Sequence, residues 1–287
     1  MTKDARSNPY VAVRSSVARR YRFISGLPRS GSTLLSAILR QNPRFHADMS
    51  SPVGGLFNTL LSDMSARNEG AVFIDNGKRQ RILRGLFDNY YEDLDEEVVF
   101  DTNRLWCSKL SALVTLFPDA KVIACVRNLS WIVDSIERLV QKNAFEPSSI
   151  FNYQSSGTVY TRANGVAGSD GMIGFAYDAL KQAVYGAESP GRLLLLRYES
   201  LTRDPKSTLK ALYTFLGEPA FTHDFEHIEY DDRGFDVKAG TPGLHTVRAK
   251  IEPNSRRSIL PPDLFKRFEH DAFWEGPSNL PDGVRIV

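Results

Sequence analysis

Residues 21–40, YRFISGLPRSGSTLLSAILR, decide how the rest of the sequence is interpreted. Residues 22–24 predict a short strand, residues 26–31 a tight loop, and the residues from Ser32 onward a helix with leucine and isoleucine on one face. The loop of such a unit lies at the N-terminus of its helix. Backbone N–H groups exposed at a helix N-terminus can bind an anion.

The loop has the spacing of a phosphate-binding loop, G-x-x-x-x-G-x-T, with Gly26, Gly31 and Thr33 in register. Ser32 occupies the position at which a loop that hydrolyses ATP or GTP has lysine. Arg29 supplies a positive charge three residues earlier. We therefore expect the loop to bind phosphate or sulfate oxygens without ordinary ATP or GTP chemistry. The alternative is a Gly/Ser-rich turn that binds nothing.

The segment GLPRSGSTLL resembles the 5′-phosphosulfate loop of the sulfotransferases, which take a sulfuryl group from 3′-phosphoadenosine 5′-phosphosulfate (PAPS) and release 3′,5′-ADP (PAP). Its PRSGST core is most similar to that of the tyrosylprotein sulfotransferases and their bacterial relatives. The resemblance implies a P-loop NTPase-like sulfotransferase fold. It also implies that the donor contacts the residues of the loop, namely Arg29, Ser30, Gly31, Ser32 and Thr33.

Alternating strands and helices after the loop predict an α/β fold with three layers, in which helices flank a parallel central sheet. The further strands are expected at residues 98–100, 121–126 and 192–197. Helices are expected after them at residues 106–117, about 130–140 and 205–216. We expect residues 1–20 to form a flexible basic arm and residues 21–287 to form a single domain.

Two segments between these units have distinct patterns. A helix capped by Asp75 or Asn76 is expected to run to about residue 91 and to bury Ile82, Leu83, Leu86 and Phe87. Residues 143–171, rich in Ser, Gly, Asn and aromatic residues, are long for a connection within a compact domain. We expect this connection to be functional or mobile. Acceptor contacts are expected there and at residues 49–61.

Three later features resemble donor-binding parts of the sulfotransferases. Arg127 follows the strand KVIACV and Ser135 comes eight residues later, and in the family such a pair holds the 3′-phosphate of the donor. Tyr198 is expected near the adenine, with a place in the core as its alternative. Arg256 and Arg257 are candidates for a late basic loop over the 3′-phosphate, with a solvated run of charge as the alternative.

The general base departs from the family pattern. The catalytic glutamate of the tyrosylprotein enzymes aligns with Ser50, which cannot act as a base unaided. His46 and Asp48, a few residues earlier, are the candidates, and His245 is a third. Each of the three also has an ordinary structural interpretation, as a surface histidine, a helix cap or a structural hydrogen-bonding group.

The charged groups around the sulfuryl position also depart from the pattern. The family lysine that bridges the phosphosulfate aligns with Thr102, and Arg104 is the candidate to replace it, with an ion pair to Asp101 as the alternative. Arg29 is expected to offset charge on the 5′-phosphate as it leaves. No metal is expected, because the donor is already activated.

The 287 residues are 42% apolar and 24% charged, with a net charge of +2. This balance is that of a soluble globular protein and gives no reason to expect a nucleic-acid partner. Cys107 and Cys125 are expected as buried free thiols. Without a secretory signal or an apolar run of about 18 residues, a cytoplasmic protein with no membrane span is expected. A homodimer is the base-rate expectation.

These features predict sulfuryl transfer from PAPS to a hydroxyl of a small-molecule, lipid or glycan acceptor, with an amine as the second choice. Two alternatives stay open. One is a P-loop kinase acting on a small molecule or nucleotide, against which Ser32 argues. The other is a protein that binds PAPS or PAP without turnover.

Overall fold

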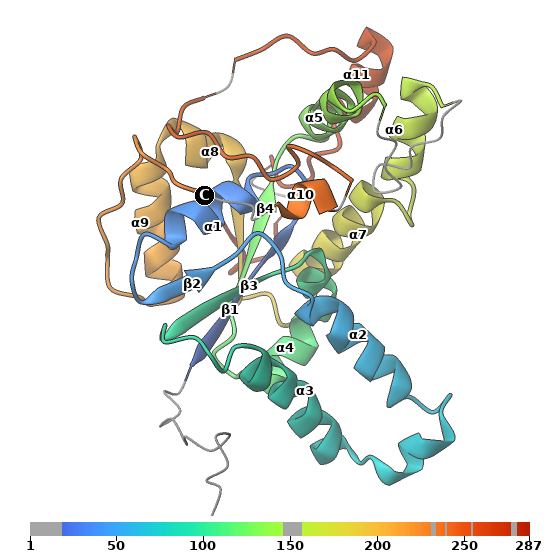
Figure 1. The fold of residues 1–287 in the computed structure, drawn as a ribbon, viewed down its shortest axis with the longest axis vertical. Helices are drawn as coiled ribbons and strands as arrows, with labels where there is room; N and C mark the ends of the chain where they lie inside the picture. The colour runs from blue at the N-terminus through green and yellow to red at the C-terminus, as the bar shows by residue number, and fades with distance from the viewer. Residues whose placement is uncertain (1–18, 146–156, 231–233, 239, 254, 277–279) are drawn as a thin grey trace, which may run out of the picture.

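The computed structural model describes residues 19–145, 157–230, 234–238, 240–253, 255–276 and 280–287. Within them, six parallel strands form one sheet in the order β2-β3-β1-β4-β5-β6 (Figure 1). The strands are β1 (Arg20–Gly26), β2 (Phe45–Ala47), β3 (Val98–Thr102), β4 (Val122–Val126), β5 (Leu193–Arg197) and β6 (Arg285–Ile286).

Helices connect and cover these strands. The α-helices are α1 (Ser32–Leu39), α2 (Val53–Asp63), α3 (Asn76–Tyr90), α4 (Leu110–Leu116), α5 (Leu129–Lys142), α6 (Val159–Ala167), α7 (Met172–Tyr185), α8 (Tyr198–Arg203), α9 (Pro205–Leu216), α10 (Phe235–Lys238) and α11 (Pro262–Glu269). Two 3₁₀ helices are η1 (Glu69–Phe73) and η2 (Arg104–Lys109). In the described part of the chain, no helix combines the length and the apolar composition needed to cross a membrane.

The core has two halves, one on each face of the sheet, because side chains alternate along buried strands. In β4, Val122 and Ala124 pack with α2, α3, α5 and α7, whereas Ile123 and Cys125 pack with α1 and α9. Figure 1 shows α1 and α9 on one side of the sheet and α3 and α4 on the other. The predicted α/β class with three layers and a parallel central sheet is confirmed.

Several local predictions hold and others are wrong. Asp75 caps α3 by accepting from the Lys78 N–H at 2.7 Å, as expected. Ile82 is 41% exposed, so the predicted buried stripe of that helix is too wide. The expected helix at residues 106–117 is divided into η2 and α4. Strands β2 and β6 were not predicted, because each is very short and lies at an edge of the sheet.

The predicted long connection at residues 143–171 contains a helix. Thr158 begins α6 with a capping box, in which its side chain and that of Thr161 each bond the other's backbone N–H. Residues 146–156, and most of the predicted arm at residues 1–20, lie outside the described residues. The predicted domain limits, cytoplasmic location and homodimer stay predictions. Both cysteines are buried free thiols, as expected.

The strand order determines where a site can form. After β1 the chain forms β2 and β3 on one side of β1, and it then crosses to β4 on the other side of β1. At such a reversal the loops that follow neighbouring strands leave the sheet in opposite directions, so a crevice opens at the carboxyl ends of the strands. The loop after β1 and the residue after β4, Arg127, therefore lie at the edge of one crevice.

Candidate functional site

The loop after β1 is shaped by close backbone contacts. Gly26 has a positive φ of 99°, and a Cβ atom there would lie 2.3 Å from the carbonyl oxygen of Cys125, so only glycine fits. The buried hydroxyl of Ser30 donates to the same carbonyl at 2.9 Å and to that of Leu27. The side chain of Ser30 thus fixes the loop, and Ser30 itself is 0% exposed, so the predicted contact of this residue with a ligand has no open surface.

The N-terminus of α1 is open to an anion. Gly31 has a φ of 94° and makes no side-chain cap, and the first helical hydrogen bond runs from the Leu35 N–H to the Gly31 carbonyl at 2.9 Å. The N–H groups before Leu35 therefore point out of the helix without an intrahelical acceptor. A Cβ atom on Gly31 would lie 2.9 Å from the ring of Tyr198, which packs against the loop.

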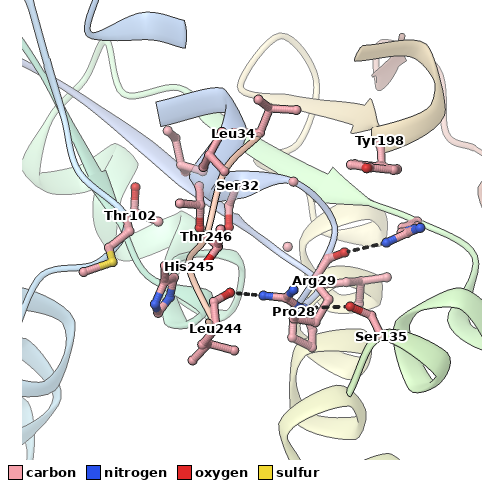
Figure 2. A pocket seen from close by; sticks show the side chains of 18 of the residues that line it. Pro28, Arg29, Ser32, Leu34, Thr102, Ser135, Tyr198, Leu244, His245 and Thr246 are labelled. Atoms are coloured by element: carbon pink, nitrogen blue, oxygen red, sulfur yellow. Dashed lines mark hydrogen bonds between the residues drawn. The ribbon is translucent and has the colours of Figure 1, made fainter. Parts of the chain in front are cut away.

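Arg29 connects the loop to two distant parts of the chain. Its φ of 57° is unusual for a residue other than glycine. Its Nε donates to Ser135 Oγ on α5 at 3.1 Å, and its Nη1 donates to the backbone carbonyl of Leu244 (Figure 2). Burial, and then repulsion from Arg127, lowers the pKa of Arg29 to about 10, so it stays charged at neutral pH.

Arg127 lies beside the loop at the end of β4. Its Nη1 donates to the backbone carbonyl of Arg29 at 3.3 Å, and its guanidinium lies 4.2 Å from the centre of the Tyr198 ring. Arg127 is only 8% exposed, and burial lowers its pKa. Its Nε has no hydrogen-bond partner among the described residues, and the nearest carboxylate, Glu199, is 3.9 Å away. Arg127 therefore keeps donor capacity.

These groups line one cavity of about 450 Å³, a volume within the range of small-molecule sites. The loop, the Arg127–Ser135 pair and residues 244–252 each contribute to its wall. Figure 2 labels Arg29, Ser135 and His245 among the side chains that line it. Apolar side chains complete it, including Met49, Met172 and Phe235. The two predicted donor-binding places thus face the same space.

His245 lines this cavity and is paired with a buried carboxylate. Asp236 is 1% exposed; its Oδ1 lies 2.5 Å from His245 Nδ1, and its Oδ2 accepts from the His245 backbone N–H at 2.7 Å. Because a carboxylate only accepts, Nδ1 carries the hydrogen and Nε2 is the basic nitrogen. Burial lowers the pKa of His245, while Asp236 acts in the opposite direction. The result is an oriented, neutral imidazole suited to accept a proton.

The other predicted bases lie elsewhere. His46 Nε2 is 3.5 Å from Asp48 Oδ2, and Asp48 also pairs with Arg40 at 3.4 Å. Neither His46 nor Asp48 is among the described residues that line the cavity, whereas Ser50 is. Burial lowers the pKa of His46. The geometry therefore favours His245 over either of them.

The residues predicted around the sulfuryl position do line the cavity. The hydroxyl of Thr102 is buried and has no hydrogen-bond partner among the described residues. The ion pair between Arg104 and Asp101, considered above as an alternative, does not form. The Asp101 carboxylate instead accepts from Ser51 Oγ (2.6 Å), Tyr91 OH (2.6 Å) and Trp106 Nε1 (2.7 Å).

The two late arginines, Arg256 and Arg257, differ in position. Arg256 lines the cavity. Arg257 is exposed and does not line it, and its backbone carbonyl accepts from Arg138. Tyr198 is half-buried at the cavity wall. Sequence reasoning missed Asp236, because its contact with His245 is made by a turn in which the Thr241 N–H bonds the Asp236 carbonyl at 2.8 Å. The spacing between Asp236 and His245 follows neither a helix period nor a strand period, so the sequence pattern does not indicate the contact.

Comparisons with known proteins agree with this architecture. Residues 23–223 match the model of the sulfotransferase family. The sulfotransferase domain from the curacin biosynthetic pathway is 17% identical, with 93% of this chain and 95% of that chain covered and a TM-score of 0.52. That likeness supports the fold.

Two further structures were found at lower similarity. The sulfotransferase domain of the Synechococcus PCC 7002 olefin synthase is 18% identical over 91% of this chain and 97% of its own, with a TM-score of 0.45. A sulfotransferase from Alicyclobacillus acidocaldarius is 17% identical over 79% of this chain and 93% of its own, with a TM-score of 0.46. No curated protein matches the chain. Since the family model spans well over half of the sequence, the chain belongs to the sulfotransferase family.

Proposed function

We propose that this protein transfers a sulfuryl group from PAPS to a hydroxyl of its acceptor and releases PAP, with an amine as the second choice of acceptor. The observation that carries the proposal is the single cavity shared by the loop after β1 and by the Arg127–Ser135 pair. A donor with a phosphate at each end of an adenosine needs two anion-binding places that face one another. The Arg29–Ser135 hydrogen bond of 3.1 Å keeps the two places together.

Each end of the donor has suitable groups. The open N–H groups at the start of α1 and the charge of Arg29 suit the 5′-phosphosulfate. Arg127, with an unused Nε, and Ser135 suit the 3′-phosphate. The Tyr198 ring lies against Arg127 and close to Gly31, and we propose that the adenine packs beside it.

His245 is proposed as the general base. Its Nε2 takes the proton of the acceptor hydroxyl as the acceptor oxygen forms a bond to sulfur. At the same time the bond between sulfur and the bridging oxygen of the 5′-phosphate breaks, and PAP carries the bonding electrons away. Asp236 holds the imidazole in the tautomer with a free Nε2. The loop N–H groups and Arg29 offset the charge that develops on the leaving phosphate.

Arg104 is proposed to replace the family lysine at the sulfuryl group. Its side chain lines the cavity and makes no hydrogen bond or ion pair with the described residues, so its charge is available. Thr102 has no charge to offer. On the acceptor side, Met49, Met172 and Phe235 offer apolar contact. These side chains favour a lipid or a largely apolar small molecule over a glycan.

Calorimetric titration tests the donor. We expect PAP to bind, 5′-AMP to bind more weakly, and ATP to gain nothing from added Mg²⁺. Binding of Mg²⁺-ATP in preference to PAP would support the kinase instead. The comparison of PAP with 5′-AMP isolates the 3′-phosphate, because the two ligands differ only there.

Transfer of radiolabelled sulfate from PAPS to a panel of hydroxyl and amine compounds tests turnover. We expect His245→Asn to keep PAP affinity and to lose about 10²-fold to 10⁴-fold in rate. If the wild type binds PAP but labels no member of an apolar and polar panel, the protein is a binder without turnover. If the Asn variant keeps its rate, His245 is not the base.

A further inference from the structure

A buried carboxylate on α5 connects this helix to the C-terminal part of the chain. The side chain of Asp134 is 0% exposed. Its Oδ1 accepts from Ser258 Oγ at 3.1 Å and from the Ile259 N–H at 2.8 Å. Its Oδ2 accepts from Arg138 Nε at 3.0 Å and lies 2.6 Å from Arg256 Nη2. A buried carboxylate is tolerated only when it is paired in this way.

The partner that matters for the cavity is Arg256. It lines the cavity with 24% of its side chain exposed, and its guanidinium lies 5.9 Å from the centre of the Trp131 ring on α5. Its Nε and Nη2 have no hydrogen-bond partner among the described residues, although Nη2 is at ion-pair distance from Asp134. The ion pair with Asp134 therefore holds Arg256 at the edge of the cavity that it lines.

Arg256 belongs to a cluster of like charges. Its proximity is one of the causes, after burial, that lower the pKa of Arg29 and of Arg127. Asp134 acts in the opposite direction on Arg127. Three guanidiniums around one cavity repel one another, and a carboxylate behind them reduces the free energy cost of keeping Arg256 there. Asp134 is also the direct neighbour of Ser135 on α5.

We propose that Asp134 is a positioning residue for the 3′-phosphate of the donor. It fixes residues 256–259 against α5, so that Arg256 joins Arg127 and Ser135 in binding a phosphate monoester. Asp134 itself does not line the cavity and acts through Arg256. The inference rests on the proposed donor, PAPS.

Calorimetry of Asp134→Asn with PAP and with 5′-AMP tests it. The amide keeps the shape of the carboxylate but loses its charge, so Arg256 is no longer held. We expect the Kd for PAP to rise about tenfold, as for loss of one charge-assisted hydrogen bond, and that for 5′-AMP to change less than about twofold. Arg256→Ala should give the same selective loss. The double variant should lose no more than Arg256→Ala alone.

A matched control is Glu137→Gln on the same helix. Glu137 is a buried carboxylate that pairs with Arg162 on α6 at 2.6 Å and does not line the cavity. This variant should leave both affinities unchanged. If Asp134→Asn does not fold, Ser258→Ala removes one anchoring hydrogen bond and should still give a smaller, PAP-selective loss.

The outcomes separate the two proposals. Equal losses for PAP and 5′-AMP, unchanged PAP affinity, or additive effects of Asp134→Asn and Arg256→Ala would overturn the positioning role. A wild type that binds PAP no better than 5′-AMP would instead refute the proposed 3′-phosphate site, and the donor with it.

Discussion

At the scale of the residue, His245 and Asp236 determine how the site should respond to pH. Burial is the main cause that lowers the pKa of His245 below 6.5, and Asp236 partly opposes it through a hydrogen bond and its charge. The neutral form is the base. Activity should therefore rise as the pH increases through a pKa below 6.5 and be level at neutral pH.

Asp236→Asn should move this acid limb to lower pH, because it removes the groups that raise the pKa of His245. Its kcat should also fall, by about tenfold or more, since the tautomer is no longer fixed. The pH profile of kcat measures both effects. Asp224→Asn is the matched control, because Asp224 pairs with Nδ1 of His227 at 3.0 Å on the exposed surface. An acid limb that moves upward in the Asp236 variant would contradict the assignment.

Arg127 and Arg29 should differ in what they contribute. Arg127→Ala should weaken PAP binding by about 1.5–3 kcal/mol, through loss of charge-assisted hydrogen bonds to a phosphate. Arg29→Ala should lower kcat more than PAP affinity, because Arg29 also holds the Leu244 carbonyl next to His245. Titration with PAP and steady-state kinetics measure the two effects. Equal losses in affinity and kcat for Arg29→Ala would argue against this second role.

Whether the sequence alone could reveal a site residue depends on the kind of element that positions it. Arg127 and Ser135 are positioned by a buried strand and the helix after it, so their spacing carries the information. The contact of His245 with Asp236 is formed by irregular loops, and no periodic pattern records it. The ion pair of Arg104 with Asp101, which was the alternative interpretation, does not form because the Asp101 carboxylate accepts from three side chains of other segments.

At the scale of the element, the loop after β1 depends on its glycines. Gly26 lies against the backbone of β4, and its positive φ is accessible only at a cost to other residues. The loop was predictable because strand, glycines and helix follow one another in the sequence. The wall at residues 244–252 was not, since it is held by the long-range bonds Ile228 N–H to Ala249 O (2.6 Å) and Ile251 N–H to Phe225 O (3.0 Å).

Gly26→Ala should destabilise the protein by about 2 kcal/mol or more, from φ strain together with overlap with the Cys125 carbonyl. PAP binding should fall in the fraction that still folds, because the loop is displaced. Gly55→Ala is the control, since a Cβ atom on this helical glycine of α2 meets nothing within 4 Å. That change should stabilise by a few tenths to about 1 kcal/mol. Urea unfolding measures the free energy of unfolding of both variants. A Gly26 variant as stable as the wild type would show that the loop can relax around the added Cβ atom.

At the scale of the whole molecule, the cavity joins segments that are distant in sequence. The loop after β1, the β4–α5 segment and residues 244–252 meet there, and Arg29 on the loop bonds to both of the other two parts. Once the strand order is known, a crevice is expected at the carboxyl ends of β1 and β4. The third wall comes from a part of the chain with little regular structure, and only the folded molecule reveals it.

A ligand that bridges these segments should stabilise the entire fold, because it binds the folded chain and not the unfolded one. At a PAP concentration of 100 times Kd, the stabilisation is about 2.7 kcal/mol. For a domain of this size, that corresponds to a rise in Tm of about 5–10 °C. The rise should be much smaller with 5′-AMP at the same concentration, and in Arg127→Ala the rise with PAP should fall toward the level given by 5′-AMP. Thermal unfolding monitored by circular dichroism measures this. Equal stabilisation by PAP and 5′-AMP would mean that only one end of the nucleotide is held, and that the cavity does not bind a bisphosphate across its two sides.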